Sequence, residues 1–288
     1  MNAIEISGLC KSYEGFRLEN FSLNLPKGSI LGLAGENGAG KSTIIKLIMN
    51  AEERDAGSVK VLGTECTSPE FNDLKNCIGV VLDEANFPAV LTAKMLCSVM
   101  ANTYKNWNSE LFFNYVQRFH LPENKKFKDF SRGMKMKLAI AAALSHNAKL
   151  LILDEATGGL DPLVRDEILD ILNDFTRDEE HSILMSSHIV SDIEKICDYF
   201  AFIHQGRLLL FGEKDEILSE YAVTKVSEEE LCDIAPQALH GVKHTPYGAE
   251  ALVEKRLAPE TLRFEHTSLE DIIIFLARGV NGNERSFN

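Results

Sequence analysis

The sequence has no apolar run long enough to cross a membrane. Its longest apolar stretches, residues 138–144 and 272–277, fall far short of the ~20 residues that a membrane helix needs. The first residues have neither a basic start nor an apolar segment, so we expect no signal peptide. These absences predict a protein that is soluble by itself and meets a membrane only by docking to a partner.

Basic residues and cysteines are also in short supply. Lys and Arg total 30 against 43 Asp and Glu, which gives a formal net charge of −13. This balance argues against a broad nucleic-acid-binding face, because such a face needs clustered positive charge. The six cysteines form no Cys-x-x-Cys pair and have no histidine cluster beside them. A metal centre or disulfide framework is therefore not expected. We expect the cysteines to be small buried apolar side chains of a protein in a reducing cytoplasm.

Against this background one segment stands out, Gly-Glu-Asn-Gly-Ala-Gly-Lys-Ser-Thr at residues 35–43. An apolar run at 30–34 predicts a buried strand before it, and residues 43–49 predict a helix after it. A strand, a glycine-rich turn and a helix form the context in which Gly-x-x-x-x-Gly-Lys-Ser cradles phosphates. Lys41 is expected to reach the β- and γ-phosphates, and the Ser42 hydroxyl to hold Mg²⁺. The residues predicted to bind the nucleotide here are Gly35, Asn37, Gly38, Ala39, Gly40, Lys41, Ser42 and Thr43.

A second apolar run, residues 150–153, ends on two adjacent carboxylates, Asp154 and Glu155. The carboxyl ends of strands in an open α/β sheet are where ligands bind, so this pair is expected at the same site. Adjacent residues of a strand face opposite sides, which predicts separate roles for the two acids. We expect Asp154 to complete the Mg²⁺ shell through water and Glu155 to orient or deprotonate the water that attacks the γ-phosphate.

Two further signals are weaker when taken alone. Ser131 and Gly133 lie at the start of a helix predicted at residues 132–145, with its apolar stretch at 138–144, where Ser131 suits an N-cap and the helix N-terminus suits an anion. An ordinary capped helix would give the same pattern. His188 follows the apolar strand at 183–186, and a lone histidine there is usually structural or exposed. Its place one strand beyond the carboxylate pair would let it reach the same phosphate.

The order of elements predicts an α/β fold. Apolar strands that alternate with helices indicate a mostly parallel sheet covered on both faces, built on a P-loop NTPase core. Alternation over residues 4–25 predicts two or three antiparallel strands with a turn at 11–15, forming an N-terminal β-subdomain. Helical periodicity over 91–119 predicts two helices of an inserted helical subdomain. After residue 212 we expect a small α+β accessory region, with strands at 249–253 and 261–264 and a final helix at 268–277.

Taken together, these motifs resemble the ATP-binding subunit of an ABC transporter, over about residues 4–212. The matching segments are 35–43 as Walker A, 150–154 as Walker B, Glu155 as the catalytic glutamate, 131–133 as the signature, Asp161 in the D-loop and His188 as the switch histidine. The resemblance also implies that Tyr13 stacks on adenine. It divides the chain into an ATP-binding domain at 1–212, with a helical subdomain at about 84–148, and an accessory subdomain at 213–288.

The chain departs from the family pattern at two places. The loop after the strand at 78–82 carries Asp83 where the family usually has glutamine, and this carboxylate can still ligate Mg²⁺. The signature has Arg132 where glycine is usual and Met134 where glutamine is usual. Ser131 and Gly133, the residues that resemble the phosphate-contacting members, are intact, so activity is expected to be retained.

The resemblance implies partners as well as chemistry. Two ATPase subunits, identical or different, would sandwich ATP, with Ser131 and Gly133 of each chain facing the nucleotide of the other and Asp161 linking the two sites. A transmembrane permease would be driven by this dimer, which places the chain in the cytoplasm at the inner face of the cell membrane. The tail resembles that of ABC-2-type exporter subunits, so export is the predicted direction.

Two other functions stay open from the sequence. One is a soluble ABC ATPase that serves translation, DNA repair or cofactor assembly. The absence of a second ATPase domain and of long coiled coils disfavours it, as does the acidity. The other is a regulatory module that binds ATP without useful hydrolysis, which the presence of Glu155 and His188 disfavours.

Overall fold

The computed structural model describes residues 1–83 and 87–285, which form two units, Met1–Leu208 and Leu209–Asn288. The elements up to the division are β1 (Asn2–Tyr13), β2 (Phe16–Pro26), β3 (Ile30–Gly35), α1 (Lys41–Ile48), β4 (Ala56–Val61), β5 (Thr64–Glu65), α2 (Phe71–Leu74), β6 (Ile78–Val81), α3 (Ala93–Thr103), α4 (Ser109–Arg118), α5 (Arg132–Leu144), β7 (Leu150–Asp154), α6 (Pro162–Phe175), β8 (Ser182–Ser187), α7 (Val190–Ile196), β9 (Tyr199–His204) and β10 (Arg207–Glu213). Short 3₁₀ helices lie at Lys75–Cys77 and Phe127–Asp129. The division falls within β10.

Two sheets form the first unit. A six-stranded sheet has the order β10-β9-β3-β8-β7-β6, and its strands from β9 to β6 run parallel to their neighbours. A four-stranded antiparallel sheet has the order β2-β1-β4-β5. The parallel strands β3, β7 and β8 are buried at every residue, as expected for a sheet covered on both faces. The α/β fold class with a mostly parallel sheet is thereby confirmed.

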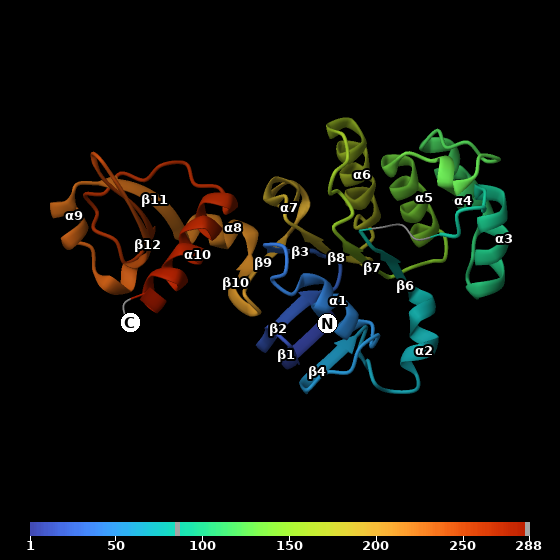
Figure 1. Cartoon of the computed structure of the whole chain (residues 1–288), viewed down its shortest axis with the longest axis horizontal. Helices are drawn as coiled ribbons and strands as arrows, with labels where there is room; N and C mark the ends of the chain where they lie inside the picture. The colour runs from blue at the N-terminus through green and yellow to red at the C-terminus, as the bar shows by residue number, and fades with distance from the viewer. Residues whose placement is uncertain (84–86, 286–288) are drawn as a thin grey trace. The chain divides into compact units, whose positions relative to one another are not determined.

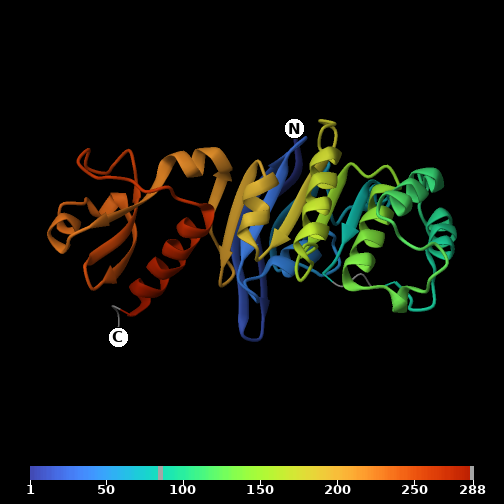
Figure 2. The ribbon, with the colours of Figure 1, turned by 90° about the horizontal axis from the view of Figure 1, so that it is seen from above.

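The helices cover the six-stranded sheet from both sides. In Figure 1, α5, α6 and α7 lie on one face, and α1 with the antiparallel sheet lies on the other. The view in Figure 2 shows α3 and α4 beyond α5, at the β6 end of the sheet. Local sequence sets where these helices begin. Thr92 and Asn108 each accept a hydrogen bond from a backbone N–H of the first turn, at 3.3 and 2.9 Å.

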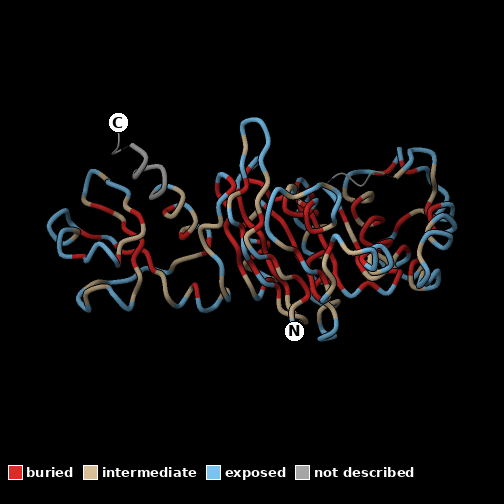
Figure 3. The backbone as a smooth tube through the Cα atoms, turned by 90° about the horizontal axis from the view of Figure 1, so that it is seen from below, coloured by how far each residue is buried: buried red, intermediate tan, exposed pale blue. Residues whose placement is uncertain are grey.

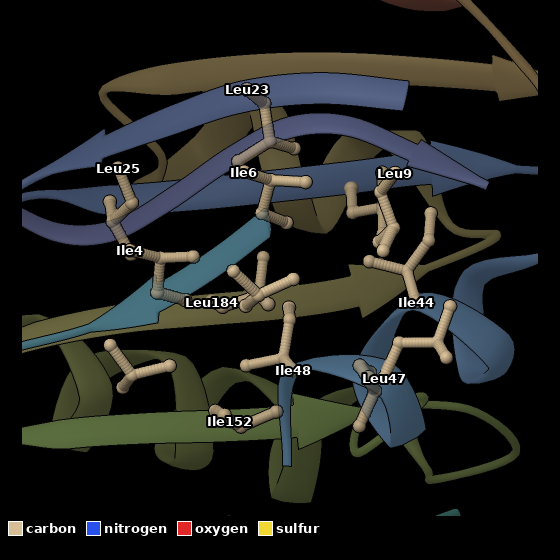
Figure 4. Close-up of a cluster of buried hydrophobic side chains, with 14 of the residues drawn as sticks. Ile4, Ile6, Leu9, Leu23, Leu25, Ile44, Leu47, Ile48, Ile152 and Leu184 are labelled. Carbon is tan, nitrogen blue, oxygen red and sulfur yellow. The ribbon is translucent and has the colours of Figure 1, made fainter. Parts of the chain in front are cut away.

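The main core lies between the two sheets and is filled by α1. Figure 4 shows the α1 side chains between those of β1 and β2 and those of β7 and β8. The labelled residues are Ile4, Ile6, Leu9, Leu23, Leu25, Ile44, Leu47, Ile48, Ile152 and Leu184, all nearly or fully buried. Because α1 is fixed along its length by this core, the turn that precedes it is held at the edge of the parallel sheet.

The second unit is an antiparallel sheet with helices. Its elements are α8 (Lys214–Glu220), β11 (Tyr221–Val226), α9 (Glu228–Cys232), β12 (Leu239–Thr245), β13 (Gly248–Glu254) and α10 (Leu269–Arg285), with a 3₁₀ helix at Pro236–Ala238. The strand order is β11-β13-β12. Helix α10 packs closely on β12, because a Cβ at Gly241 would lie 2.6 Å from the carbonyl oxygen of Phe275. Figure 3 shows buried residues in the strands of each unit and also on helices of the first unit.

The structure corrects several expected elements. The turn predicted at residues 11–15 is shorter, because β1 continues to Tyr13, which pairs with Phe16. The strand predicted at 261–264 is wrong, since only a single bridge joins Phe264 to Thr224. Strands β11 and β12 were not anticipated. Residues 84–86, the start of the expected helical subdomain, lie outside the described residues; α3, α4 and α5 fall within its expected span.

Candidate functional site

The turn between β3 and α1 forms a cradle lined by backbone. Gly38 and Gly40 have φ of +82° and +115°, in the left-handed region that favours glycine. A Cβ at Gly40 would also lie 2.7 Å from the ring of Phe16. Gly40 is the N-cap of α1 and no side chain caps it, so the first N–H groups of the helix are directed at the turn. Such a turn is suited to bind a phosphate group.

Lys41 lies at the base of this turn with a side chain that is 5% exposed. Its Nζ donates hydrogen bonds to the carbonyl oxygens of Gly35 and Glu36 at 2.7 and 3.2 Å. The same ammonium group lies 3.0 Å from Glu155 Oε1. The structure therefore brings the lysine of the first motif and the second acid of the other motif into direct contact.

Glu155 stands just beyond the end of β7, with φ +51°. Its N–H donates to the Ser186 carbonyl and hydroxyl oxygens, both at 3.1 Å. Its Oε2 lies 2.5 Å from His188 Nδ1 and accepts a hydrogen bond from the His188 N–H at 3.2 Å. Burial alone would raise the pKa of Glu155, but the hydrogen bonds and charges of Lys41 and His188 outweigh it and hold the pKa below its ordinary value.

Asp154 is the last residue of β7 and is buried. One of its carboxylate oxygens accepts a hydrogen bond from the Ser186 hydroxyl at 2.5 Å. The carboxylates of the two acids contact different side chains, Ser186 for Asp154 and Lys41 with His188 for Glu155, but strand alternation is not the reason. Because Glu155 lies outside the strand in a left-handed conformation, the turn of the backbone directs its side chain toward Lys41.

Lys41 and Glu155 open onto a cavity of about 460 Å³, whereas Asp154 and His188 are not among the residues that line it. Its walls come from the β1–β2 hairpin, the glycine-rich turn, the start of α1 and the loops that follow β6 and β7. The lining residues are Tyr13, Phe16, Glu36, Asn37, Gly38, Gly40, Lys41, Ser42, Thr43, Asp83 and Glu155. The volume is that of a pocket for a small molecule, and its walls combine two aromatic rings at one part with backbone N–H groups and Lys41 at another.

Tyr13 is at the end of β1, with a ring that is 42% exposed. Its hydroxyl donates a hydrogen bond to Glu52, and this bond with the negative charge of Glu52 raises the pKa of Tyr13 to about 12. Lys11 Nζ lies 5.3 Å from the centre of the ring and the Phe16 ring lies 6.3 Å away. The phenol therefore stays neutral at physiological pH and presents an aromatic surface at the mouth of the cavity.

Asp83 lines the cavity, but its carboxylate already has a partner. Arg132 Nη2 lies 2.8 Å from Asp83 Oδ1, and both side chains are about half exposed. Arg132 is the first residue of α5, directly after Ser131. Two of the three residues that depart from the family pattern are thus joined to each other.

Ser131, Gly133 and Asp161 do not line the cavity. Ser131 and Asp161 are the N-caps of α5 and α6, and each accepts a hydrogen bond from the N–H three residues later, at 3.2 and 3.1 Å. A Cβ at Gly133 would lie 3.4 Å from a methyl group of Val164, which is an ordinary contact. Within one chain these residues form a second group, beside the cavity and linked to it through Arg132.

The chain is similar to known proteins in sequence and in fold. The family profile described as ABC transporter matches residues 18–158. The lantibiotic transport ATP-binding protein SrtF of Streptococcus pyogenes is 37% identical over 216 residues, 74% of this chain and 91% of that protein. This chain belongs to the ABC transporter family. The uncharacterized ABC transporter ATP-binding protein YcbN of Bacillus subtilis is 31% identical, over 98% of both chains.

A solved structure titled as the ATP binding subunit of an ABC transporter covers 75% of this chain and 92% of its own, with 27% identity and a TM-score of 0.69. The prediction of an ABC ATP-binding subunit from motif order is confirmed by these similarities, as is ATPase activity coupled to transport. In the part of the chain that the structure describes, no helix has the length and apolarity that a bilayer span requires.

The sequence did not reveal every wall of this cavity. Phe16 lies against Gly40 and Glu52 holds Tyr13, yet neither pair is close in sequence. Ser186 contacts both acids through its hydroxyl and carbonyl groups, although it was identified only as the end of a strand. Glu36 also lines the cavity and was not among the predicted residues, although its place inside the glycine-rich motif was a signal that could have identified it.

Proposed function

We propose that this cavity holds Mg-ATP and that hydrolysis of the ATP drives a membrane-embedded exporter. The observation that carries the proposal is the contact of Lys41 with Glu155 and of Glu155 with His188, at the wall formed by the glycine-rich turn. A phosphate-binding lysine, a carboxylate and a histidine are thereby assembled where a γ-phosphate would lie.

Each residue has a proposed role toward ATP. Tyr13 stacks on the adenine. The backbone of residues 35–43 and Lys41 bind the phosphates, so a γ-phosphate that pairs with Lys41 displaces Glu155 Oε1 from it. Glu155 is then free to orient a water and accept its proton, while His188 holds Glu155 Oε2 and reaches toward the phosphate.

The oxygen ligands of the cavity fit Mg²⁺. Protein sites for this ion usually combine one or two carboxylates with phosphate oxygens and water, and the described residues contain no ready-made cluster of three or more ligands. Ser42 and Asp83, which line the cavity, and Asp154, which does not, are the proposed protein ligands, with Asp154 acting through water and Asp83 shared with Arg132. When bound, the ion neutralises charge on the phosphates and aligns them for attack.

The active form is proposed to be a dimer of ATPase subunits. Ser131 and Gly133, at the N-terminus of a 13-residue helix outside the cavity of their own chain, would face the γ-phosphate held by the other subunit. Asp161 at the start of α6 would connect the two sites. Residues 1–212 are proposed as the ATP-binding domain and residues 213–288 as the accessory one.

The membrane partner is proposed to be a permease, which places this subunit at the inner face of the cell membrane. The relative SrtF is named for lantibiotic transport, which supports export of a peptide or similar amphipathic compound as the substrate class. The substrate itself would be selected by the permease.

Two variants test this function. Glu155→Gln is expected to bind ATP, hydrolyse it at least about 100-fold more slowly and accumulate as a dimer, because the nucleotide that joins the subunits persists. Lys41→Ala is expected to lose most of its ATP affinity, because the buried ammonium is removed from the phosphate cradle. Turnover, equilibrium ATP binding and light-scattering mass would be measured for both.

Glu110→Gln and Lys128→Ala are matched controls, since both residues are exposed and lie outside the cavity. They should behave as the unmodified protein does. A Glu155→Gln variant that stays monomeric with full activity would refute the assignment of Glu155. Normal ATP binding by Lys41→Ala would refute the assignment of the cavity.

Co-purification of a polytopic membrane protein from detergent-solubilised membranes would support the transport partner, and ribosomal or repair proteins in its place would contradict it.

A further inference from the structure

The ion pair between Asp83 and Arg132 connects two segments that are 49 residues apart. Asp83 is part of the cavity wall that also contains Lys41 and Glu155. Arg132 is outside the cavity and begins α5, so its guanidinium reaches back to the cavity from the first turn of that helix. Through this contact a charge of the cavity is compensated from a different element.

Arg132 also lies against the turn between β7 and α6. A Cβ at Gly159 would come within 2.8 Å of Arg132 Nη1. A Cβ at Gly158 would lie 3.9 Å from Arg132 Nη2 and 3.5 Å from the His188 ring. The guanidinium therefore lies next to the segment that carries Glu155 and close to His188.

The charges of Asp83 and Arg132 affect how well the cavity can bind a nucleotide. An uncompensated carboxylate at Asp83 would repel a triphosphate in the same cavity, since like charges in one cavity repel each other appreciably even in a partly solvated site. The family pattern has a neutral residue at each position, glutamine in place of Asp83 and glycine in place of Arg132. Here the two charges have opposite sign and are in contact, so the cavity gains no net charge from them.

We propose that Asp83 and Arg132 act as one unit and that Arg132 is a positioning residue for the ATP site of its own chain. It neutralises Asp83 and fixes the direction of that carboxylate, and in doing so ties the start of α5 to the cavity. The inference rests on the proposed assignment of this cavity to ATP.

A double-variant cycle tests the pair. Equilibrium binding of AMP-PNP, a non-hydrolysable ATP analogue, would be measured by calorimetry for Asp83→Asn, Arg132→Gln and the double variant. We expect Arg132→Gln to weaken binding about threefold or more at low salt, and less at high salt, because it leaves Asp83 unpaired beside the phosphates. All binding is measured with EDTA in place of Mg²⁺, because Asp83 is also a proposed ligand of that ion. Under this condition Asp83→Asn should bind as tightly as the unmodified protein or more tightly. The double variant should return to within about twofold of the unmodified protein.

Two further variants control for effects on folding and charge. Arg118→Gln removes an arginine from another half-exposed ion pair, with Asp174, that lies outside the cavity, and it should leave AMP-PNP affinity unchanged. Arg132→Lys keeps the charge and should bind nearly as the unmodified protein does. Thermal unfolding without nucleotide would establish that each variant is folded.

The outcomes separate this inference from the function on which it rests. If the unmodified chain binds no AMP-PNP, the proposed function fails and the inference fails with it. If the unmodified chain binds and Arg132→Gln binds equally well, the inference alone is overturned, and Arg132 would act only toward the other subunit. An equal loss in Arg132→Gln and in the double variant would also overturn it, because Arg132 would then act independently of Asp83.

Discussion

Glu155 shows at the scale of one residue how the fold tunes a catalytic group. Burial favours its protonated form, while Lys41 at 3.0 Å and His188 at 2.5 Å favour the carboxylate. The partners prevail, and the pKa is lowered from its ordinary value of 4.5. The group is therefore ionised at physiological pH, and it becomes a better proton acceptor when a phosphate pairs with Lys41 and draws that partner away, while His188 still holds Oε2.

This lowered pKa predicts how stability depends on pH in the protein without nucleotide. The folded state holds the proton of Glu155 less tightly than the unfolded state does. The ionised Glu155 therefore adds to the free energy of unfolding, and this contribution is complete above about pH 4.5. It is lost as the pH falls through the lower, folded-state pKa. Glu155→Gln removes the titrating group, so its free energy of unfolding should fall less steeply between about pH 5 and pH 3. Urea unfolding over this range measures it, with Glu110→Gln as the control, and equal slopes in all three proteins would contradict the prediction.

The site residues that are neighbours in the sequence could be predicted from it. The contacts between site residues that are far apart in the sequence could not. Lys41 and Ser42 are fixed by a motif of nine neighbouring residues, and the strand and helix around it are where the pattern requires them. The pairing of Arg132 with Asp83 spans 49 residues and that of Tyr13 with Glu52 spans 39. Such contacts depend on how separate elements pack, and no local spacing encodes them.

At the scale of elements, α7 packs so closely on β3 that the strand needs a glycine. A Cβ at Gly32 would lie 2.1 Å from a methyl group of Ile193 and 2.9 Å from the sulfur of Cys197. Both neighbours are buried and belong to α7 or its end, so the helix has little freedom to move away. This contact sets the distance between the helix layer and the strand that leads into the phosphate cradle.

Gly32→Ala is therefore expected to destabilise the first unit by about 1–3 kcal/mol or more, since overpacking a filled core forces strained side chains and backbone shifts. Chemical denaturation monitored by circular dichroism would measure the loss. Gly133→Ala is the control for stability, because its new Cβ makes only an ordinary contact at 3.4 Å and replaces a helical glycine. It should be neutral or stabilising, and equal stability of Gly32→Ala would show that α7 is not fixed as described.

The elements that the sequence predicted well are those with strong apolar patterns. Strands β3, β7 and β8 are buried throughout, and their apolar runs were visible. Strand β12 contains a glycine, two histidines and a lysine, and only Gly241 is buried in it, so no alternation was present to detect. Residues 261–264 do alternate, but only Phe264 pairs with β11, through a single bridge. In this second unit, pairing with neighbouring strands decides which residues form strands, and the local apolar pattern gives little indication of them.

At the scale of the whole molecule, each unit has a core of its own. The core that surrounds α1 draws on residues between Ala3 and Ile203. A smaller cluster, made of Val226, Ile234, Ala238, Ala249, Ala251 and Val253, belongs to the second unit. All cavity residues lie between Tyr13 and Glu155, in the first unit. A ligand in the cavity should therefore stabilise one unit directly and the other only through whatever coupling joins them.

Calorimetry with AMP-PNP tests this division. We expect two unfolding transitions. Saturation at about 100 times the dissociation constant adds about 2.7 kcal/mol to the first unit, which raises its midpoint by about 5–10 °C and leaves the second unchanged. A chain ending after Glu213 identifies the first transition, because it keeps β10, the last strand of the six-stranded sheet, and removes the second unit. Lys41→Ala should show no shift. A single transition that moves as a whole would mean that the accessory unit unfolds with the ATP-binding domain, and that nucleotide binding is felt through the entire chain.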